Sequence, residues 1–191
     1  MGGGDKGLLP LGDNTLLDHV IERLQPQCER LAINANGDPT RFSHFGCPVI
    51  SDTLPDYPGP LAGVLAGLDW AAGEGVDAIV TAAADTPFLP RDLVARLKEA
   101  ATAKGVPIAL AASPDEHGAP RRHPTFGLWP VALRADLRDE LVRGLRKIVL
   151  WTDRHGAAST QFSTSPFDPF FNVNTPDDMV RARAFLAAEK S

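Results

Sequence analysis

The chain has 191 residues, of which 43% are hydrophobic and 23% are charged, and its formal net charge is −5 at pH 7. A chain of this length is predicted to form a single domain that buries roughly 70% of its unfolded surface, and its negative charge argues against a general nucleic-acid-binding surface. The absence of any run of eighteen apolar residues predicts no membrane span, and two cysteines without metal-ligand spacing indicate a reduced, cytoplasmic protein.

Short apolar strands alternate with helical patterns over the first 112 residues. In chain order, the patterns predict an extended piece at 8–11, a helix at 15–23, strands at 30–34 and 48–51, a helix at 61–72, a strand at 77–83, a helix at 90–104 and a strand at 107–112. Asn14 or Thr15 is the expected cap of the first helix. This alternation predicts βα units with a mainly parallel sheet, and the lack of polar alternation in the strands predicts helices on both faces.

The remainder of the chain is less regular. Its patterns predict a polar loop at 113–122, an extended segment at 125–129, a helix at 131–143, two short ambiguous segments at 147–151 and 157–162, and a last helix at 177–189. The turn Asn174-Thr175-Pro176 opens the last helix, with proline at a favoured position of the first turn.

Asp85 is the most informative residue of the sequence. It follows the predicted strand at 77–83, and a carboxylate at the carboxyl end of a parallel strand lies where open α/β sheets bind ligands. Such an oxygen ligand suits Mg²⁺ held between protein and phosphates. The alternative from this segment alone is a cap or a local turn before the helix predicted to begin near Pro90.

Lys6 lies among the glycines of Gly2-Gly3-Gly4-Asp5-Lys6-Gly7. Glycines let backbone N–H groups approach an anion and a lysine neutralises it, so the segment has the ingredients of a phosphate cradle. It is not a P-loop, because no serine or threonine follows the lysine. A flexible terminus explains the same residues.

Asn34 and Asp52 each end a predicted strand. A side-chain amide at such a position can contact a base edge or a ribose, although Asn36-Gly37 is also a common turn. Further on, Pro58-Gly59-Pro60 opens the helix at 61–72, whose N-terminus is able to face an anion.

The second half of the chain offers three polar groups. Asn172 and Asn174 flank an apolar valine, so both amides point to one side of an extended segment, toward a ligand or as a helix cap. His123 follows two arginines and is a candidate contact for a phosphate or a pterin, with a solvated loop as the alternative. Arg146 and Lys147 form a basic group, with a solvated helix face as the alternative.

Taken in order, these pieces resemble the molybdenum cofactor guanylyltransferases, which join GMP from GTP to molybdopterin. The matching segments span the chain: Met1-Gly2-Gly3 with Asp5-Lys6-Gly7-Leu8-Leu9, Asn34-Ala35-Asn36, Ile50 with Asp52, Asp56-Tyr57-Pro58-Gly59-Pro60-Leu61-Ala62-Gly63, Asp85-Thr86-Pro87, His123-Pro124-Thr125, and Phe171-Asn172-Val173-Asn174-Thr175-Pro176. The resemblance implies a three-layer, Rossmann-like α/β fold of the nucleotidyltransferase type and a Mg²⁺-dependent transferase.

The resemblance also implies roles for individual residues. Lys6 and Asp85 are the implied catalytic residues, as the phosphate-contacting lysine and the Mg²⁺ ligand. Asn34 and Asp52, together with Lys6 and Asp85, are the implied contacts of the guanine nucleotide. The implied molybdopterin-side residues are Asn172, Asn174, His123, Arg146 and Lys147. Residues 1–112 would then form the nucleotide-binding part of a single domain, 1–191, and residues 113–191 the molybdopterin-side part with the C-terminal helix.

The sequence departs from the family pattern at its start. Family members open with a strand and a Leu-Ala-Gly-Gly turn before an internal Met-Gly-Gly, with which Met1 aligns here, so the first strand and its glycine turn are expected to be missing from this chain. The alternatives are a molybdopterin cytidylyltransferase, a sugar-phosphate nucleotidyltransferase or a truncated, non-catalytic molybdopterin-binding protein. The expected partners are GTP, molybdopterin and molybdoenzymes or their chaperones, without nucleic acid or membrane.

Overall fold

The computed structural model describes residues 5–54 and 59–189. Its strands are β1 (Pro10–Leu11), β2 (Asn14–Thr15), β3 (Ile33–Asn34), β4 (Val49–Ile50), β5 (Ala78–Thr81), β6 (Ile108–Pro114), β7 (Pro120–Pro130) and β8 (Ala157–Gln161). Its α-helices are α1 (Leu16–Leu24), α2 (Pro60–Glu74), α3 (Leu93–Lys104), α4 (Arg134–Val142), α5 (Ile148–His155) and α6 (Pro176–Glu189). Short 3₁₀ turns are η1 (Lys6–Leu8), η2 (Gln25–Gln27), η3 (Pro39–Phe45) and η4 (Val131–Leu133).

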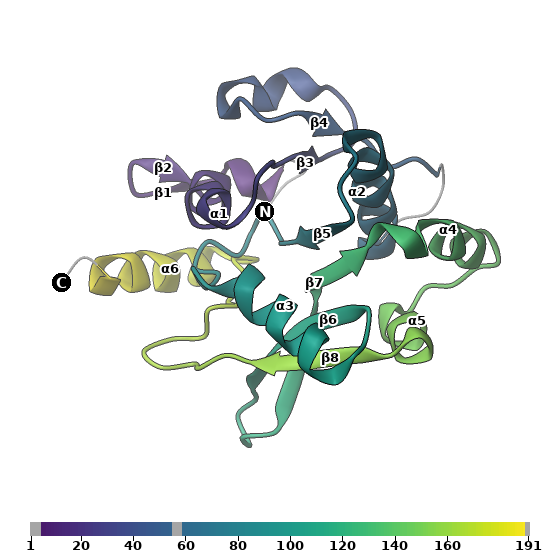
Figure 1. Cartoon of the computed structure of the whole chain (residues 1–191). Coiled ribbons are helices and arrows are strands. Elements are labelled where there is room, and N and C mark those ends of the chain that lie inside the picture. The colour runs from purple at the N-terminus through teal and green to yellow at the C-terminus, as the bar shows by residue number, and fades with distance from the viewer. Residues whose placement is uncertain (1–4, 55–58, 190–191) are drawn as a thin grey trace.

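The main sheet has the strand order β5-β7-β6-β8 among the described residues. β7 is antiparallel to both β5 and β6, whereas β6 and β8 pair in parallel, so β5, β6 and β8 run in the same direction. β3 and β4 form a separate parallel pair. The expected α/β fold with mainly parallel strands is therefore confirmed (Figure 1).

The side chains of β6 show why the fold has three layers. Ala109 and Ala111 pack into one apolar cluster with α1 and α3, whereas Ile108 and Leu110 pack into a second cluster with α2 and α4. Successive residues of a strand point to opposite faces, so both faces of this strand are covered by helices. All four side chains are fully buried, which explains why the sequence of this strand lacks polar alternation.

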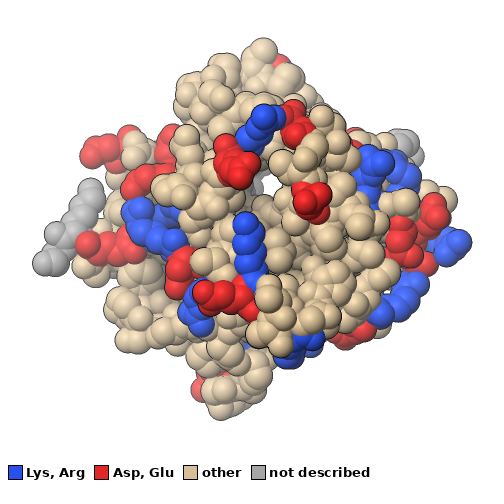
Figure 2. Space-filling model, viewed as in Figure 1, with Lys and Arg blue, Asp and Glu red and all other residues tan. Residues whose placement is uncertain are grey.

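The sheet is interrupted between β3 and β5. In the part of the chain that the structure describes, no strand pairs with the second edge of either one. Helix α2 bridges the interruption, because it contacts β3 and β4 on one side and β5 and β7 on the other. Figure 2 shows an opening in the surface at this place, between the positions of β3 and β5 in Figure 1.

The polar segment 113–122 was expected to be a loop, and this prediction is wrong at both ends of the segment. β6 continues to Pro114 and β7 begins at Pro120, so the two ends belong to the strands of an antiparallel hairpin and residues 115–119 form the turn between them. Asp115 organises the turn between them: its carboxylate accepts the backbone N–H groups of His117 and Ala119. Polar residues are tolerated in these strands because the hairpin extends beyond the packed core, where most of the outer part of β7 is exposed.

Several helix boundaries also differ from the prediction. The helix expected at 131–143 is a 3₁₀ turn followed by α4, and the ambiguous segment at 147–151 is the start of α5. The helix expected from Pro90 begins at Leu93, three residues later. The first helix behaves as expected, since Thr15 and Asp18 form a reciprocal capping box. No helix within residues 5–54 and 59–189 is long and apolar enough to span a membrane.

Candidate nucleotide-binding site

Asp85 lies in a tight turn after β5, at the carboxyl end of the strand, as the sequence predicts. The three residues that follow it are buried, so the turn is anchored in the core while Asp85 itself is half-buried. The alternative role as a helix cap is excluded, because α3 begins at Leu93 and its N-cap residue is Asp92. The position of Asp85 therefore needs an explanation other than helix capping.

The surroundings of the Asp85 carboxyl group act on its pKa in opposite directions. Burial raises the pKa above its ordinary value, while the residue's own backbone N–H, the Lys6 ammonium and the Thr86 hydroxyl lower it, and burial is the stronger effect. A carboxylate that is partly removed from water and has few donors of its own gains most from a cation brought to it.

The segment around Val173 lies directly against this turn. The backbone N–H of Val173 donates to the carbonyl oxygen of Asp85 at 2.9 Å, and the valine is fully buried while both neighbouring asparagines are exposed. Asn172 accepts a hydrogen bond of 2.9 Å from the Thr86 hydroxyl. Asn174 accepts one of 2.8 Å from the Lys6 ammonium. The two asparagine side chains therefore both face the Asp85 turn and its neighbour Lys6.

The helix that follows does not need Asn174 as its cap. The hydroxyl of Thr175 accepts the backbone N–H of Asp178 at 3.1 Å, and the carboxylate of Asp178 in turn accepts the backbone N–H of Thr175 at 2.9 Å. This reciprocal arrangement satisfies the first turn of α6. The sequence leaves open two roles for Asn174, a contact with a ligand and a helix cap. Thr175 caps the helix, and the Asn174 amide is directed at Lys6 instead.

Lys6 is positioned by the close packing of the residue after it. A Cβ atom on Gly7 would lie 3.1 Å from the Cβ of Ala84 and 3.5 Å from that of Leu17. Only glycine lets η1 approach the turn before Asp85 so closely. The Lys6 ammonium, which donates to Asn174, lies close enough to Asp85 to lower the pKa of its carboxyl group.

Asn34 and Asp52 form a second polar group at the carboxyl ends of β3 and β4. The Asn34 amide donates to Asp52 at 3.1 Å and to the carbonyl oxygen of Ile50 at 3.3 Å. Asn36 forms two hydrogen bonds with Asp52. Its amide nitrogen donates to the Asp52 carboxylate at 2.8 Å, and its amide oxygen accepts the Asp52 backbone N–H at 2.9 Å. Gly63 of α2 fits against this group, because a Cβ there would lie 2.6 Å from Asn34 Oδ1.

His123 lies in β7, apart from both groups. Its Nε2 atom is 2.7 Å from the hydroxyl of the fully buried Ser113, and its ring stacks on Phe170 with 4.4 Å between centroids. Burial lowers the pKa of His123 to about 4, against the carboxylate of Asp168 and together with the Arg121 guanidinium. At neutral pH this side chain is an uncharged imidazole. Its stacking partner, Phe170, lies two positions before Asn172 in the sequence.

The shifted pKa predicts how stability depends on pH. The unfolded chain binds a proton at His123 near pH 6.5, whereas the folded chain does so only near pH 4. The contribution of the neutral His123 to the free energy of unfolding is therefore fully present above pH 6.5 and is lost as the pH drops toward 4. We expect the His123→Gln variant to lose less of its melting temperature than the parent protein between pH 7 and pH 4.5. The exposed His117, changed to Gln, is the control. Parallel melting curves for His123→Gln and the parent would contradict the assignment.

Arg146 and Lys147 lie between α4 and α5, and both are exposed. Arg146 lines a small hollow with Gly59 and Pro60, at the beginning of α2. By these contacts Arg146 belongs near the helix that carries Gly63, rather than near Asn172 and Asn174. No contact among the described residues brings Lys147 to either polar group.

Two motifs of the sequence fall outside the described residues. The glycines at positions 2–4 and the first three residues of the motif at 56–63, which include the first proline of the Pro-Gly-Pro turn, are not part of the ranges 5–54 and 59–189. Their predicted contacts with phosphate stay predictions.

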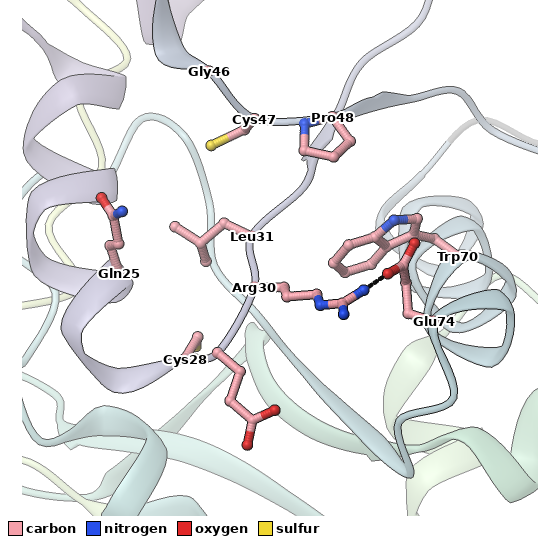
Figure 3. Close-up of a pocket in the computed structure, with 10 residues that line it drawn as sticks. Gln25, Cys28, Arg30, Leu31, Gly46, Cys47, Pro48, Trp70 and Glu74 are labelled. Atoms are coloured by element: carbon pink, nitrogen blue, oxygen red, sulfur yellow. Dashed lines mark ion pairs between the residues drawn. The ribbon is translucent and has the colours of Figure 1, made fainter.

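A cavity of about 320 Å³ lies at the opposite end of β3 (Figure 3). It is lined by residues that precede β3 and β4 and by Trp70 and Glu74 near the end of α2, and the Arg30–Glu74 ion pair crosses it. Ligands of open α/β sheets bind at the carboxyl ends of the strands. The cavity is therefore at the wrong end of the sheet to be the nucleotide site.

The metal-binding capacity of the site is limited to single carboxylates. Within the described part of the chain, no three histidine, cysteine, aspartate or glutamate side chains gather as a closed metal site would require. Mg²⁺ differs from such metals, because it keeps several waters and is often held by one or two carboxylates together with substrate phosphates. Asp85, with Lys6 beside it, fits that arrangement.

The structure brings together four of the sequence-predicted site residues around the Asp85 turn and two more, Asn34 and Asp52, at the ends of β3 and β4. Reasoning from sequence had not singled out Asn36 or Thr86 as site residues, although both lie inside motifs that it recognised. It also missed Arg41, which donates to the backbone carbonyl oxygen of Asn36 at 2.6 Å. Arg41 lies in η3, a segment without a recognisable pattern, and no signal in the sequence indicates it.

Polar groups at the carboxyl ends of strands in a three-layer α/β fold are the arrangement of a ligand-binding protein with an open α/β sheet. The family model for the MobA-like NTP transferase domain matches residues 1–157. The chain belongs to this family, and its curated relatives are molybdenum cofactor guanylyltransferases.

Relatives in several bacteria match nearly the whole chain. The molybdenum cofactor guanylyltransferase of Mesorhizobium japonicum is 50% identical over 100% of this chain and 92% of its own length. That of Nitrobacter hamburgensis is 47% identical over 99% of this chain and 90% of its own length. That of Rhodopseudomonas palustris is 51% identical over 95% of this chain and 86% of its own length.

Solved structures support the fold independently. The molybdopterin-guanine dinucleotide biosynthesis protein A of Archaeoglobus fulgidus superposes with a TM-score of 0.72 at 22% identity, covering 97% of this chain and 92% of that one. The 2-C-methyl-D-erythritol 4-phosphate cytidylyltransferase of Thermus thermophilus gives 0.69 at 19% identity, covering 97% and 96%. At these identities the likeness shows the fold alone.

Proposed function

We propose that this protein transfers GMP from GTP to the molybdopterin cofactor, forming the guanine dinucleotide and releasing pyrophosphate. The observation that carries the proposal is the identity of 47–51% to molybdenum cofactor guanylyltransferases over 95–100% of the chain. The grouping of Lys6, Asp85, Asn172 and Asn174 supports it, because these residues come from distant parts of the chain and meet at one turn.

In this reaction an oxygen of the terminal molybdopterin phosphate forms a bond to the α-phosphorus of GTP, and the bond from that phosphorus to the bridging oxygen of pyrophosphate breaks. The attacking phosphate is already ionised, so no general base is required. Positioning and charge neutralisation then account for most of the catalysis. His123 is not needed as a base here, because it is neutral, hydrogen-bonds to the Ser113 hydroxyl and lies apart from the Asp85 turn.

The residues around the Asp85 turn have separate tasks in this proposal. Asp85 would hold a Mg²⁺ ion, which when bound supplies positive charge to phosphate oxygens. Lys6 offsets negative charge on the α-phosphate or on the departing pyrophosphate. Asn172 and Asn174 present amides toward the molybdopterin side, and Asn174 also holds the Lys6 ammonium in place.

The two polar groups would bind different parts of the nucleotide. Asn34 and Asp52 would bind the guanine nucleoside at the ends of β3 and β4, with Asn36 holding the carboxylate of Asp52 in position. Residues 1–112 would thus serve the nucleotide and residues 113–191 the molybdopterin. Arg146, which lines a hollow beside the start of α2, would be the exception to this division.

The direct test is an assay of the purified protein with molybdopterin cofactor, Mg²⁺ and each of GTP, CTP and ATP. The proposal requires formation of pyrophosphate and a dinucleotide with GTP in clear preference. Preference for CTP would identify a cytidylyltransferase instead, and binding of molybdopterin without turnover would identify a non-catalytic carrier. A second candidate is not favoured by any contact in the described site.

Gly63 offers a test of the nucleoside side. Changing Gly63 to Ala puts a Cβ within 2.6 Å of Asn34 Oδ1, so the amide must move and its hydrogen bonds to Asp52 and Ile50 are lost. We expect the affinity for GTP, measured by calorimetry, to fall by about tenfold, the scale of one or two hydrogen bonds. Gly73→Ala is a matched control in the same helix, because nothing lies within 4 Å of its Cβ. Equal losses in both variants would contradict a role for Asn34.

The setting of the reaction is also part of the proposal. Cys28 and Cys47 are both free thiols, which suits the reducing cytoplasm. The product would pass to molybdoenzymes or to chaperones that serve them.

A further inference from the structure

All three nitrogen atoms of the Arg41 guanidinium group donate hydrogen bonds. It donates to the carboxylate of Asp5 through Nε, to the carbonyl oxygen of Asp38 through Nη1, and to that of Asn36 through Nη2 at 2.6 Å. The group also lies over the ring of Phe42, 4.6 Å from its centroid. Its side chain is 28% exposed, whereas the three residues to which it donates are exposed. An arginine held on three sides and over one face is a fixed structural part rather than a mobile surface charge.

The partners of Arg41 belong to the two polar groups of the site. Asp5 immediately precedes Lys6, which lies beside Asp85. Asn36 grips Asp52, the carboxylate at the end of β4. Arg41 therefore connects Asp5, the residue before Lys6, to Asn36, the residue that holds the carboxylate of Asp52.

This connection matters because the sheet does not provide it. Within the ranges 5–54 and 59–189, β3 and β4 form their own pair and share no strand pairing with the main sheet. The ends of β3 and β4 carry the nucleoside side, whereas the main sheet carries the Asp85 turn. Helix α2 joins the two sheets at the back through packing. At the polar end, the Asp5–Arg41–Asn36 link joins them through directed hydrogen bonds.

We propose that Arg41 is a positioning residue that couples the Lys6 side and the Asp52 side of the nucleotide site into one rigid frame. The inference rests on the proposed function, because it assumes that a single nucleotide is held at both sides. When the two sides are fixed relative to each other, the second contact forms without further ordering of the protein. Without Arg41, each side would still bind its own part of the nucleotide, but the advantage of binding both together would be lost.

The test compares Arg41→Ala and Arg41→Lys with the parent protein. Arg41→Ala should weaken GTP binding and raise the KM for GTP by about 10- to 100-fold, the scale of a misplaced contact, while kcat at saturating GTP changes by less than about threefold. The KM of Arg41→Lys for GTP should lie between those of the parent and of Arg41→Ala, because an ammonium group cannot reproduce the three hydrogen bonds of the guanidinium group. The melting temperature should change little, so that a KM effect with unchanged stability separates positioning from general folding.

A double-mutant cycle with Asp5→Asn distinguishes positioning from direct contact with the nucleotide. If Arg41 acts through Asp5, the effects of Asp5→Asn and Arg41→Ala on GTP affinity are strongly non-additive. Additive effects would mean that Arg41 binds the nucleotide itself and would overturn the proposal. If Arg41→Ala does not fold, Arg41→Lys and Asp5→Asn carry the same comparison.

The matched control is Arg91→Ala. Arg91 forms an exposed ion pair of 3.1 Å with Glu22, and GTP affinity should stay within twofold of the parent. A parent protein that binds no GTP would overturn the proposed function and this inference with it. A parent that binds GTP, together with an Arg41→Ala variant that binds it equally well, would overturn the coupling alone.

Discussion

Replacement of Asp85 by alanine is expected to abolish Mg²⁺-dependent guanylyl transfer while leaving the fold intact. The carboxylate is the candidate metal ligand at the end of β5, and removing it leaves Lys6 as the nearby cation for the phosphates. A bound metal contributes several kcal/mol to transition-state stabilisation, so the rate should fall on the order of 10³-fold or more. The measurement is pyrophosphate release at saturating GTP and molybdopterin, as a function of Mg²⁺ concentration.

Two companion variants make this result specific. Asp85→Asn keeps the shape of the side chain and removes the charge, so it should lose nearly as much activity as the alanine variant. Asp77→Ala removes an exposed carboxylate just before the start of β5, where the backbone carbonyl oxygen accepts the N–H of Val131, and activity should be retained. Near-normal turnover of Asp85→Ala would remove the residue from the site.

The parts of the fold that were predictable from sequence are those set by local pattern. The presence of a strand before Asp85, although it is shorter and less buried than its apolar run predicts, and the helix cap at Thr15 follow from an apolar run and from a cap residue beside the helix. The alternation of exposed Asn172 and Asn174 with buried Val173 is likewise a local signal with period two. These predictions were confirmed because neighbouring residues alone determine them.

The parts that were not predictable depend on partners far away in the chain. The hairpin of β6 and β7 resembles a polar loop in sequence, because its outer end lies beyond the core and is held by strand pairing and by Asp115. Trp151 seemed part of an ambiguous segment, whereas its burial against Trp129 and its bond to Asp136 stabilise α5. The role of Arg41 depends on Asp5, thirty-six positions earlier, a separation that no local pattern records.

The candidate site shows the same division. Individual strand-end residues were recognisable, but their grouping into one set around Asp85 and another around Asp52 depends on the order of strands in space. The interrupted sheet adds to this, since the two sets lie on different sheets in the described residues. The resemblance supplied the roles, and the fold supplied the grouping.

Replacement of Lys6 by alanine is expected to lower kcat for guanylyl transfer by about 10²- to 10³-fold, the cost of losing one charged donor to a reacting phosphate. Lys6 is held between the Asp85 turn and Asn174, so its ammonium faces the place where the phosphates would lie. Single-turnover measurements with GTP and molybdopterin would separate this loss in the chemical step from weaker binding. Lys104→Ala, which removes an exposed lysine at the end of α3, is the charge-matched control.

The Asn174→Ala variant sharpens the interpretation of the Lys6 result. The Asn174 amide oxygen is the hydrogen-bond acceptor that holds the Lys6 ammonium at 2.8 Å, so its loss releases the lysine without removing the charge. We expect a smaller decrease in kcat, and almost none on top of Lys6→Ala, because the two residues would act as a unit. A full additional loss in the double variant would show that Asn174 contacts the second substrate directly. Unchanged kinetics of Lys6→Ala would exclude Lys6 from the reacting centre, whatever the effect of Asn174.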